Sequence, residues 1–303
     1  MGRAAAGSRG EPLCRLIRFE ATDGVGLAGL LYQSNVGRAL TRPVGLKPDP
    51  HVVIWIHGTG GASIFESSRT NLLARVFVEH GIAFFPFNNR GAQFVRRAGR
   101  GRYGGSAYER IRDCVKDIDG AVRELWRRGL RDITLAGHST GANKIAVYDH
   151  YKKRNRARRY VLLAGADDAG LEYKAFGARR FRALLKKART MPIHALMPGR
   201  MMSWRAFYDM ANPNGDYNVF PFLQATRGRQ PFRLVRGIRK PALYVYGEND
   251  QYEFDAGLLA ENIGPNGEIV VMRGADHAFA GREEELAQLI AEWVLECGGL
   301  PPL

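Results

Sequence analysis

The chain has 303 residues, of which 45% are hydrophobic and 25% are charged, and its formal net charge is +15. These values are ordinary for a globular protein and exclude a disordered chain, a collagen-like chain and a small disulfide scaffold. Three widely spaced cysteines predict neither a zinc site nor a disulfide framework, and they favour a reducing, cytoplasmic location. No apolar run approaches the roughly 18 residues of a membrane span. Residues 1–12 lack the apolar region of a secretory signal and are expected to form a disordered tail.

The high positive charge raises the question of a nucleic acid, an anionic membrane or an acidic substrate as a partner. Arginines are scattered over the whole chain, and no helix-turn-helix, zinc-finger or aromatic RNA-binding signature accompanies them. The sequence therefore argues against nucleic acid as the main partner. It leaves the oligomeric state open.

Apolar runs give the expected order of the elements along the chain. Residues 13–20 and 27–32 flank a Thr-Asp-Gly turn and predict an N-terminal hairpin. Strands then alternate with helices, which is typical of a parallel α/β sheet. The expected buried strands are 51–56, 81–87, 132–136, 160–164, 242–246 and 268–272. The expected helices are 71–80, one that begins at a Ser106–Glu109 capping box and continues to about 128, 142–151, 256–263 and 283–295.

The segment 165–237 interrupts this alternation. It is basic, it is rich in Met, Pro, Phe and Tyr, and it has no buried-strand pattern. We therefore expect an α/β core formed by 13–164 and 238–303, with 165–237 inserted as a cap. Within the insertion, Phe181, Leu184 and Leu185 alternate with Arg and Lys and predict an amphipathic helix with its apolar face toward the sheet. Its basic face is either solvated or meets an anionic substrate or lipid surface.

The pentapeptide 137–141 (GHSTG) lies between a predicted strand and a predicted helix. This is the context in which a G-x-S-x-G motif presents a serine nucleophile on a sharp turn. Gly137 and Gly141 leave room for neighbouring chain, and the helix end behind Ser139 offers N–H groups to developing negative charge. The motif therefore predicts that Ser139 is a nucleophile.

An activated serine needs a base, and the base needs an orienting carboxylate. In this architecture the chain order is serine, acid, histidine. His277 follows the last predicted strand and is the expected base, and Asp250, which follows the preceding strand, is the expected acid. Asp167 or Asp168, after the strand 160–164, is the rival acid.

The remaining requirement is a pair of N–H donors for the oxyanion. The N–H of Thr140, directly after the serine, is the expected first donor. The loop 57–61 (HGTGG) follows the strand 51–56, and its Thr59 is the expected second donor. The other residues expected to contact the substrate are Gly58, Gly60, His138, Trp204 and Phe207. No metal site is expected.

These motifs together resemble the α/β-hydrolase superfamily: strand-HGTGG, NNRG, strand-GHSTG-helix, strand-GENDQ and strand-GADHAF, over about 51–295. The GHSTG motif with the preceding YGGS is similar to a subgroup that includes fungal siderophore esterases. The segment NNRG departs from the more usual D-x-R-G, at a place that is generally structural. The resemblance implies an eight-stranded, mostly parallel sheet, no cofactor and a cap after the sixth strand.

The sequence therefore predicts a serine hydrolase that acts on a small-molecule carboxylic ester through an acyl-enzyme. The same triad would also serve an amidase, a peptidase or an acyltransferase, because the difference lies mainly in the protonation of the leaving group. A non-catalytic binding protein of this fold is the third alternative, and it would need no nucleophile. The acyl and alcohol parts of the substrate are not specified by the sequence.

Overall fold

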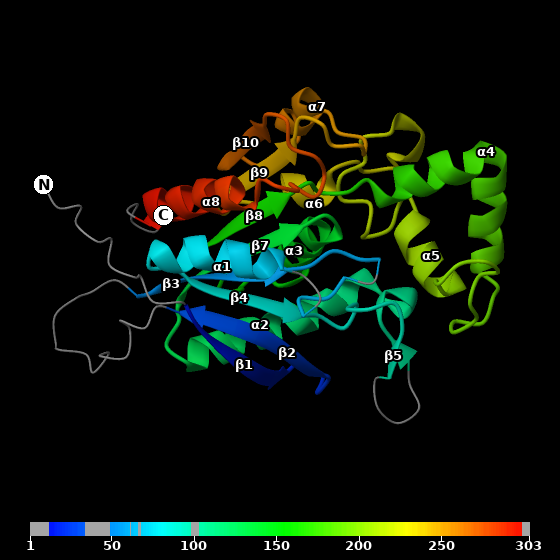
Figure 1. Ribbon diagram of the computed structural model, residues 1–303. Helices are drawn as coiled ribbons and strands as arrows, with labels where there is room; N and C mark the ends of the chain where they lie inside the picture. The colour runs from blue at the N-terminus through cyan, green and yellow to red at the C-terminus, as the bar shows by residue number, and fades with distance from the viewer. Residues whose placement is uncertain (1–11, 34–48, 61, 66–67, 98–102, 299–303) are drawn as a thin grey trace, which may run out of the picture.

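The computed structural model describes residues 12–33, 49–60, 62–65, 68–97 and 103–298. The expected tail therefore lies outside the described residues, except for Pro12. Eight strands form one sheet in the order β1-β2-β4-β3-β7-β8-β9-β10 (Figure 1). They are β1 (Leu13–Glu20), β2 (Gly26–Gln33), β3 (His51–Ile56), β4 (Ala83–Asn88), β7 (Asp132–His138), β8 (Arg159–Leu163), β9 (Ala242–Gly247) and β10 (Gly267–Met272).

The sheet is mostly parallel, as expected. β2 pairs antiparallel with β1 and β4, and every pairing from β4 through to β10 is parallel. The central strands read as continuous apolar runs because both of their faces are covered. In β3, for example, Val52, Val53, Ile54 and Ile56 have no exposed surface.

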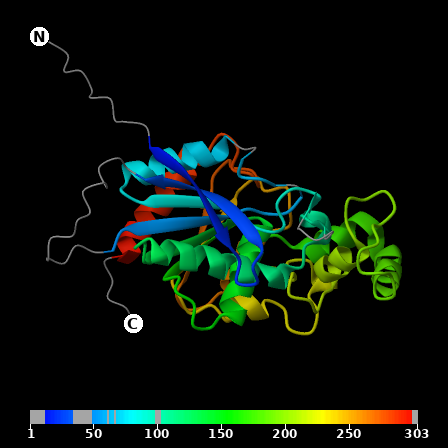
Figure 2. The ribbon, with the colours of Figure 1, turned by 90° about the horizontal axis from the view of Figure 1, so that it is seen from below.

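Helices cover both faces of the sheet. α1 (Arg69–Glu79) and α8 (Glu283–Gly298) lie side by side on one face, and α2 (Cys114–Arg127) and α3 (Thr140–Tyr151) on the other (Figures 1 and 2). Two short helices, α6 (Arg233–Arg236) and α7 (Ala256–Ala260), flank β9 in the chain. In the part of the chain that the structure describes, no helix has the length and apolar character needed to cross a membrane.

The capping box predicted at Ser106 and Glu109 was wrong. Residues Ser106–Tyr108 form one turn of 3-10 helix, and α2 begins only at Cys114. Glu109 is buried and its carboxylate pairs with Lys144, with 2.7 Å between Oε1 and Nζ. The Glu109 side chain therefore forms a long-range ion pair and not the helix cap that the local sequence pattern had predicted. The expected apolar stripe of the helix is present, since Ile118, Val122 and Leu125 are buried.

Between β4 and α2 lies a small antiparallel ribbon of β5 (Arg96–Arg97) and β6 (Tyr103–Gly104). The segment 165–237 lies between β8 and β9 and contains α4 (Asp168–Ala188) and α5 (Trp204–Ala211). These two helices extend away from the sheet, at the end of the molecule opposite the chain termini (Figures 1 and 2).

The predicted orientation of the basic helix was also wrong. α4 bends at Gly177, where φ is 70°, and Phe181 in its second half is buried against α5 rather than against the sheet. The apolar side chains of the two helices form a core of their own, separate from the main core. Its buried members are Phe181, Ala188, Met197, Trp204, Phe207 and Ala211.

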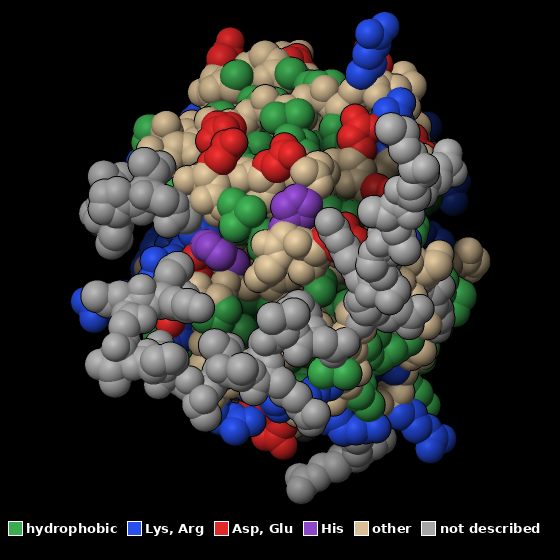
Figure 3. All heavy atoms as spheres, turned by 60° about the vertical axis from the view of Figure 1, so that its left-hand side comes forward, with side chains coloured by type: hydrophobic (Ala, Val, Ile, Leu, Met, Phe, Trp, Pro, Cys, Tyr) green, Lys and Arg blue, Asp and Glu red, His purple; other side chains and the backbone are tan. Residues whose placement is uncertain are grey.

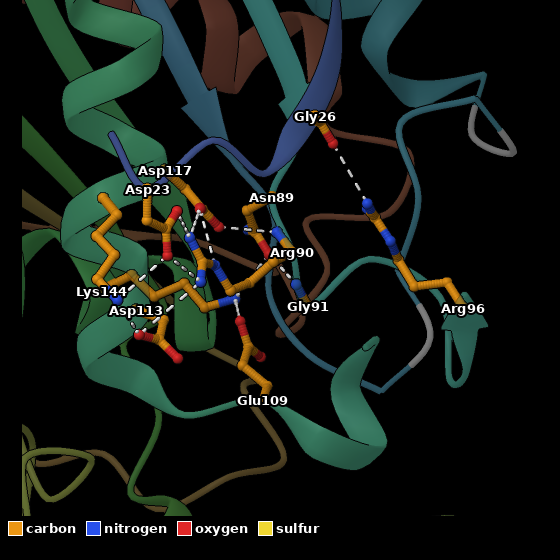
Figure 4. Close-up of polar contacts among 11 residues, drawn as sticks. Asp23, Gly26, Asn89, Arg90, Gly91, Arg96, Glu109, Asp113, Asp117 and Lys144 are labelled. Carbon is orange, nitrogen blue, oxygen red and sulfur yellow. Dashed lines mark hydrogen bonds and ion pairs between the residues drawn. The ribbon is translucent and has the colours of Figure 1, made fainter. Parts of the chain in front are cut away.

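Arg90, in the NNRG segment, ties the hairpin to the helical face. Its guanidinium contacts Asp117 in α2 at 2.7 Å and Asp23 in the turn between β1 and β2 at 2.9 Å (Figure 4). The side chain of Asp117 has no exposed surface, so its charge depends on this partner. The arginine of this segment thus joins the hairpin to α2, although an asparagine stands where D-x-R-G has an aspartate.

Candidate active site

Ser139 occupies a strained turn between β7 and α3. Its φ of 57° and ψ of −130° lie outside the regions that L-residues ordinarily adopt. The turn is so tight that a Cβ atom at Gly137 would lie 2.3 Å from the Gly141 carbonyl oxygen. A Cβ atom at Gly141 would lie 2.2 Å from the carbonyl oxygen of Ile56, at the end of β3. Both glycines are thus required by contacts with backbone, which is the reason that the sequence motif predicted.

His277 lies within hydrogen-bond distance of Ser139. Its Nε2 is 3.0 Å from the Ser139 Oγ, and its Nδ1 is 3.0 Å from the Asp250 Oδ2. The side chains of His277 and Asp250 are only 10% and 4% exposed. The Tyr252 ring stands edge-on to the His277 ring, with 4.4 Å between centroids. These three predicted residues are therefore assembled in the order serine, imidazole, carboxylate, largely shielded from water.

The loops after β9 and β10 are held together by hydrogen bonds, one between backbone groups and one to the Glu248 carboxylate. Asn249 N–H donates to the Ala275 carbonyl at 2.8 Å, and Glu248 accepts from the Gly274 N–H at 2.7 Å. Gly247 permits this approach, because a Cβ atom there would lie 2.3 Å from the Ala275 carbonyl oxygen. The positions of Asp250 and His277 are consequently fixed relative to one another by the same pair of loops.

The rival acids lie elsewhere. Asp167 accepts hydrogen bonds from the N–H groups of Gly170 and Leu223, at 2.7 and 2.8 Å, and so caps α4. Asp168 contacts the side-chain amide of Asn143 at 3.2 Å. Burial raises the pKa of Asp167 to about 6 and that of Asp168 well above its usual value. Asp250 is therefore the one of these three carboxylates that contacts His277.

His138, directly before the serine, contacts the loop that carries His277. Its Nε2–H donates to the backbone carbonyl of His277 at 2.7 Å, and burial lowers the pKa of His138 to about 3. A neutral ring with its proton on Nε2 satisfies this contact, because a carbonyl oxygen only accepts. We expected His138 to contact the substrate, and the structure adds this backbone contact, which the motif alone did not indicate.

The loop after β3 lies directly against the serine. A Cβ atom at Gly58 would be 3.2 Å from the Ser139 Cβ and 3.6 Å from its Oγ. Thr59 and Gly60 follow in this loop, and Gly60 has a φ of 76°. Gly61 lies outside the described residues. Thr140, the first residue of α3, is buried. The loop and the start of α3 thus flank Ser139, and their roles as oxyanion donors remain a prediction.

A chain of buried polar contacts, which no sequence motif indicated, holds the loop after β3 in place. His57 Nδ1–H donates to the Gly58 carbonyl at 2.8 Å, and its Nε2 accepts from the Asn89 N–H at 3.2 Å. Burial, together with the charge of Lys144, lowers the pKa of His57 to about 3, so the ring is neutral. The Asn89 side chain accepts from Lys144, whose ammonium pairs with Glu109 (Figure 4). The sequence feature that could have indicated these contacts is Lys144, which stands among apolar residues in the middle of α3.

The two aromatic residues that were expected to contact the substrate lie in α5. Trp204 and Phe207 are 2% and 0% exposed and belong to the core between α4 and α5. Phe207 packs edge-on against Phe176 of α4 at 6.0 Å between centroids. Their packing role is evident from these contacts, and contact with a substrate remains a prediction.

Residues 53–289 match a family model described as the alpha/beta hydrolase family. No curated protein matches the chain. Among solved structures, Est1E from Butyrivibrio proteoclasticus with bound ferulic acid is similar at 16% identity and a TM-score of 0.62, over 92% of this chain and 98% of that one. A soluble variant of monoglyceride lipase from Saccharomyces cerevisiae, in complex with a substrate analogue, is similar at 15% identity and 0.60, over 95% and 96%.

A third similar structure is a puromycin-hydrolyzing peptidase from Mycobacterium tuberculosis, at 17% identity and a TM-score of 0.59, over 96% of this chain and 40% of that one. At such identities the likeness concerns the fold. The likeness covers between 92% and 96% of this chain.

The close packing behind Ser139 predicts a strong effect of one added methyl group. Gly141→Ala places its Cβ against the Ile56 carbonyl, so we expect the free energy of unfolding to fall by about 2 kcal/mol or more. Helix propensity alone predicts the opposite sign, because alanine stabilises a helix relative to glycine. Urea denaturation measures the change. Gly26→Ala is the matched control, since no atom lies within 4 Å of the added Cβ there, and an equal loss in both variants would contradict the packing argument.

Proposed function

We propose that this chain, which belongs to the alpha/beta hydrolase family, is a serine hydrolase that cleaves carboxylic esters. The observation that carries the proposal is the line of contacts from Ser139 Oγ through His277 to Asp250, at 3.0 Å on each side of the imidazole. Such a line supplies a nucleophile, a base and an orienting carboxylate in one place. A binding protein of this fold would not need it.

The reaction follows from the roles that these atoms can take. Ser139 Oγ attacks the ester carbonyl carbon while its proton passes to His277 Nε2. The Asp250 carboxylate accepts from His277 Nδ1–H, which holds the correct tautomer and stabilises the imidazolium. His277 then protonates the departing alcohol, which leaves an acyl group on Ser139. A water molecule, deprotonated by His277, releases the acid and restores the serine.

The tetrahedral intermediate needs donors on the side opposite to the imidazole. We assign this role to the N–H groups of Thr140 and Thr59. The support is the position of Gly58 against Ser139 and the location of Thr140 at the start of α3. A helix start carries N–H groups without intrahelical partners and the positive end of the helix dipole. The buried polar contacts from His57 to Glu109 would keep the loop of Thr59 in position while negative charge develops on the carbonyl oxygen of the substrate.

We further propose that residues 165–237 form a cap over a core of 13–164 and 238–303. The separate apolar core between α4 and α5 supports this division, and so does the position of both helices beyond the sheet (Figure 1). Gly60, His138, Trp204 and Phe207 would then line or support the substrate site. The GHSTG motif favours the siderophore-esterase subgroup, and the three widely spaced cysteines favour a cytoplasmic location.

Removal of the nucleophile tests the proposal directly. We expect Ser139→Ala to lower kcat on p-nitrophenyl esters by a factor of about 10⁴ or more, because no other group can form the acyl-enzyme. A fluorophosphonate probe should label the wild-type protein at Ser139 and leave the variant unlabelled. Full activity in the alanine variant would contradict the mechanism. Faster cleavage of an aminoacyl anilide than of any ester would instead indicate a peptidase.

The acid is tested by a comparison of two aspartates. Asp250→Asn should lower kcat by up to about 10⁴, since an amide in that place favours the wrong imidazole tautomer. Asp167→Asn is the control, because its remaining oxygen can still accept a hydrogen bond at the start of α4. Steady-state kinetics on one ester, with circular dichroism to verify folding, distinguish the two. If Asp167→Asn lost activity and Asp250→Asn did not, Asp167, which follows β8, would be the orienting acid.

A further inference from the structure

The outer part of the cap has a charge pattern that ester hydrolysis does not explain. From 173 to 208 the sequence has nine lysines and arginines and no aspartate or glutamate. Three of these cations, Lys174, Arg200 and Arg205, pair with carboxylates outside the run. Within the described chain, no carboxylate lies within ion-pair distance of the other six. These six are Arg179, Arg180, Arg182, Lys186, Lys187 and Arg189; together with residues 190–203 they are called the cap tip.

The structure of α4 directs these cations outward. Phe181, Leu184, Leu185 and Ala188 follow a helical spacing and pack toward α5. The six cations take the remaining positions of the helix and the turn after it. Arg180 lies over the Phe176 ring at 5.1 Å and Lys187 over the Trp204 ring at 4.9 Å. The basic face is therefore attached to a rigid pair of helices and is not a flexible tail.

Large apolar side chains are exposed beside this basic face. In the loop that follows α4, Ile193, Leu196 and Met201 are 59%, 47% and 58% exposed. The loop is shaped by a hydrogen bond of 2.8 Å from the Met197 N–H to the Met202 carbonyl. Met197 is buried in the cap core, so the loop is anchored on its inner side while Leu196 and Met201 stand outside.

The opposite end of the molecule differs from the cap tip. Figure 3 shows the face that lies toward the left of Figure 1, and there carboxylates and cations occur on the same surface. No other acid-free stretch of the sequence holds as many cations as the nine between 173 and 208. Solubility alone does not account for this surface, because exposed apolar side chains beside the cations do not favour solubility and are typical of an interaction site.

We propose that the cap tip is a docking surface for the anionic headgroups of a phospholipid bilayer. Lysines and arginines near such a surface are attracted to its negative potential, and apolar side chains beside them enter the boundary between headgroups and acyl chains. Both kinds of side chain are present here, on a rigid support. A nucleic acid would use the cations but would leave Ile193, Leu196 and Met201 in water, since phosphates and sugars offer aliphatic groups no matching surface.

Docking in this way would direct the active site toward the membrane. The cap segment leaves the sheet after β8, at the carboxyl end of the parallel strands. Ser139 follows β7 at the same end. A lipophilic ester held in the bilayer would then meet the enzyme on the side of the sheet that carries the nucleophile. Binding itself does not depend on the triad, so the two proposals can fail separately.

The test is cosedimentation of the full chain with vesicles of phosphatidylcholine, with and without phosphatidylglycerol, over a series of salt concentrations. We expect binding only to the anionic vesicles, and weaker binding as salt rises. The variant Arg182→Glu with Lys186→Glu should lower the partition constant about 30-fold or more, from two cations at the surface. The variant Ile193→Ser with Met201→Ser should weaken binding at every salt concentration without changing the salt dependence.

A matched control is available at the other end of the molecule. Lys153 and Arg154 are exposed and follow the end of α3, which runs from the serine toward the amino ends of the strands. Replacement of both by glutamate changes the net charge as much as the cap variant does, and it should leave vesicle binding close to that of the wild type. Ser139→Ala should also bind normally, and Arg182→Glu with Lys186→Glu should hydrolyse a soluble neutral ester at the wild-type rate.

Three results would overturn the proposal. The first is the absence of binding to anionic vesicles at low salt. The second is an equal loss of binding in the control and the cap variants, which would show that net charge alone determines vesicle binding. The third is binding to duplex DNA that is tighter than vesicle binding and insensitive to Ile193→Ser with Met201→Ser, which would identify nucleic acid as the partner.

Discussion

The architecture of the candidate site depends on one close contact between backbone segments. The end of β3 meets the first turn of α3 so closely that the carbonyl oxygen of Ile56 occupies the space of a side chain at Gly141. This contact brings the loop after β3 alongside the serine turn. In the same turn Ser139 has an unusual backbone conformation, and its hydroxyl lies 3.0 Å from His277 Nε2. Ser139 and the loop after β3 are thus placed next to one another by the same packing.

Buried polar groups hold the loop after β3 in place beside α3. Lys144 and Glu109 are 0% and 3% exposed, and a buried ion pair is expensive to desolvate. Its contribution is better understood as positional: the ammonium also reaches Asn89, whose backbone N–H holds the neutral ring of His57. Burial keeps that ring uncharged, so it can accept from Asn89 and donate to Gly58 at the same time. The polar chain therefore links the helix behind the serine to the loop in front of it.

Much of the fold was predictable because its signals are local. A strand buried on both faces reads as an apolar run whatever lies beside it, and β3 was predicted to the residue. The serine turn was predictable because G-x-S-x-G records a steric requirement of the backbone. Asp250 was preferred because it is short and follows a strand end by a few residues, but Asp167 also lies between the serine and the histidine in the chain. Only the contact of Asp250 with His277 distinguishes the two physically.

The errors have a common cause, which is competition from distant partners. Glu109 had the spacing of a helix cap, yet Lys144, 35 positions farther along the chain, takes its carboxylate. The apolar face of α4 was assigned to the sheet, because the sequence does not show that α5 offers a second apolar surface. Periodicity identifies the face that is buried but not the element that covers it.

The proposed mechanism requires Ser139 to be the nucleophile and the N–H groups of Thr140 and Thr59 to be the oxyanion donors. The most direct measurement is a crystal structure of the protein after reaction with a phosphonate ester. We predict phosphorus bonded to Ser139 Oγ, with a phosphonyl oxygen within hydrogen-bond distance of both backbone N–H groups. An adduct on another residue would rule out Ser139 as the nucleophile, and an oxygen that faces away from both N–H groups would rule out the proposed oxyanion donors.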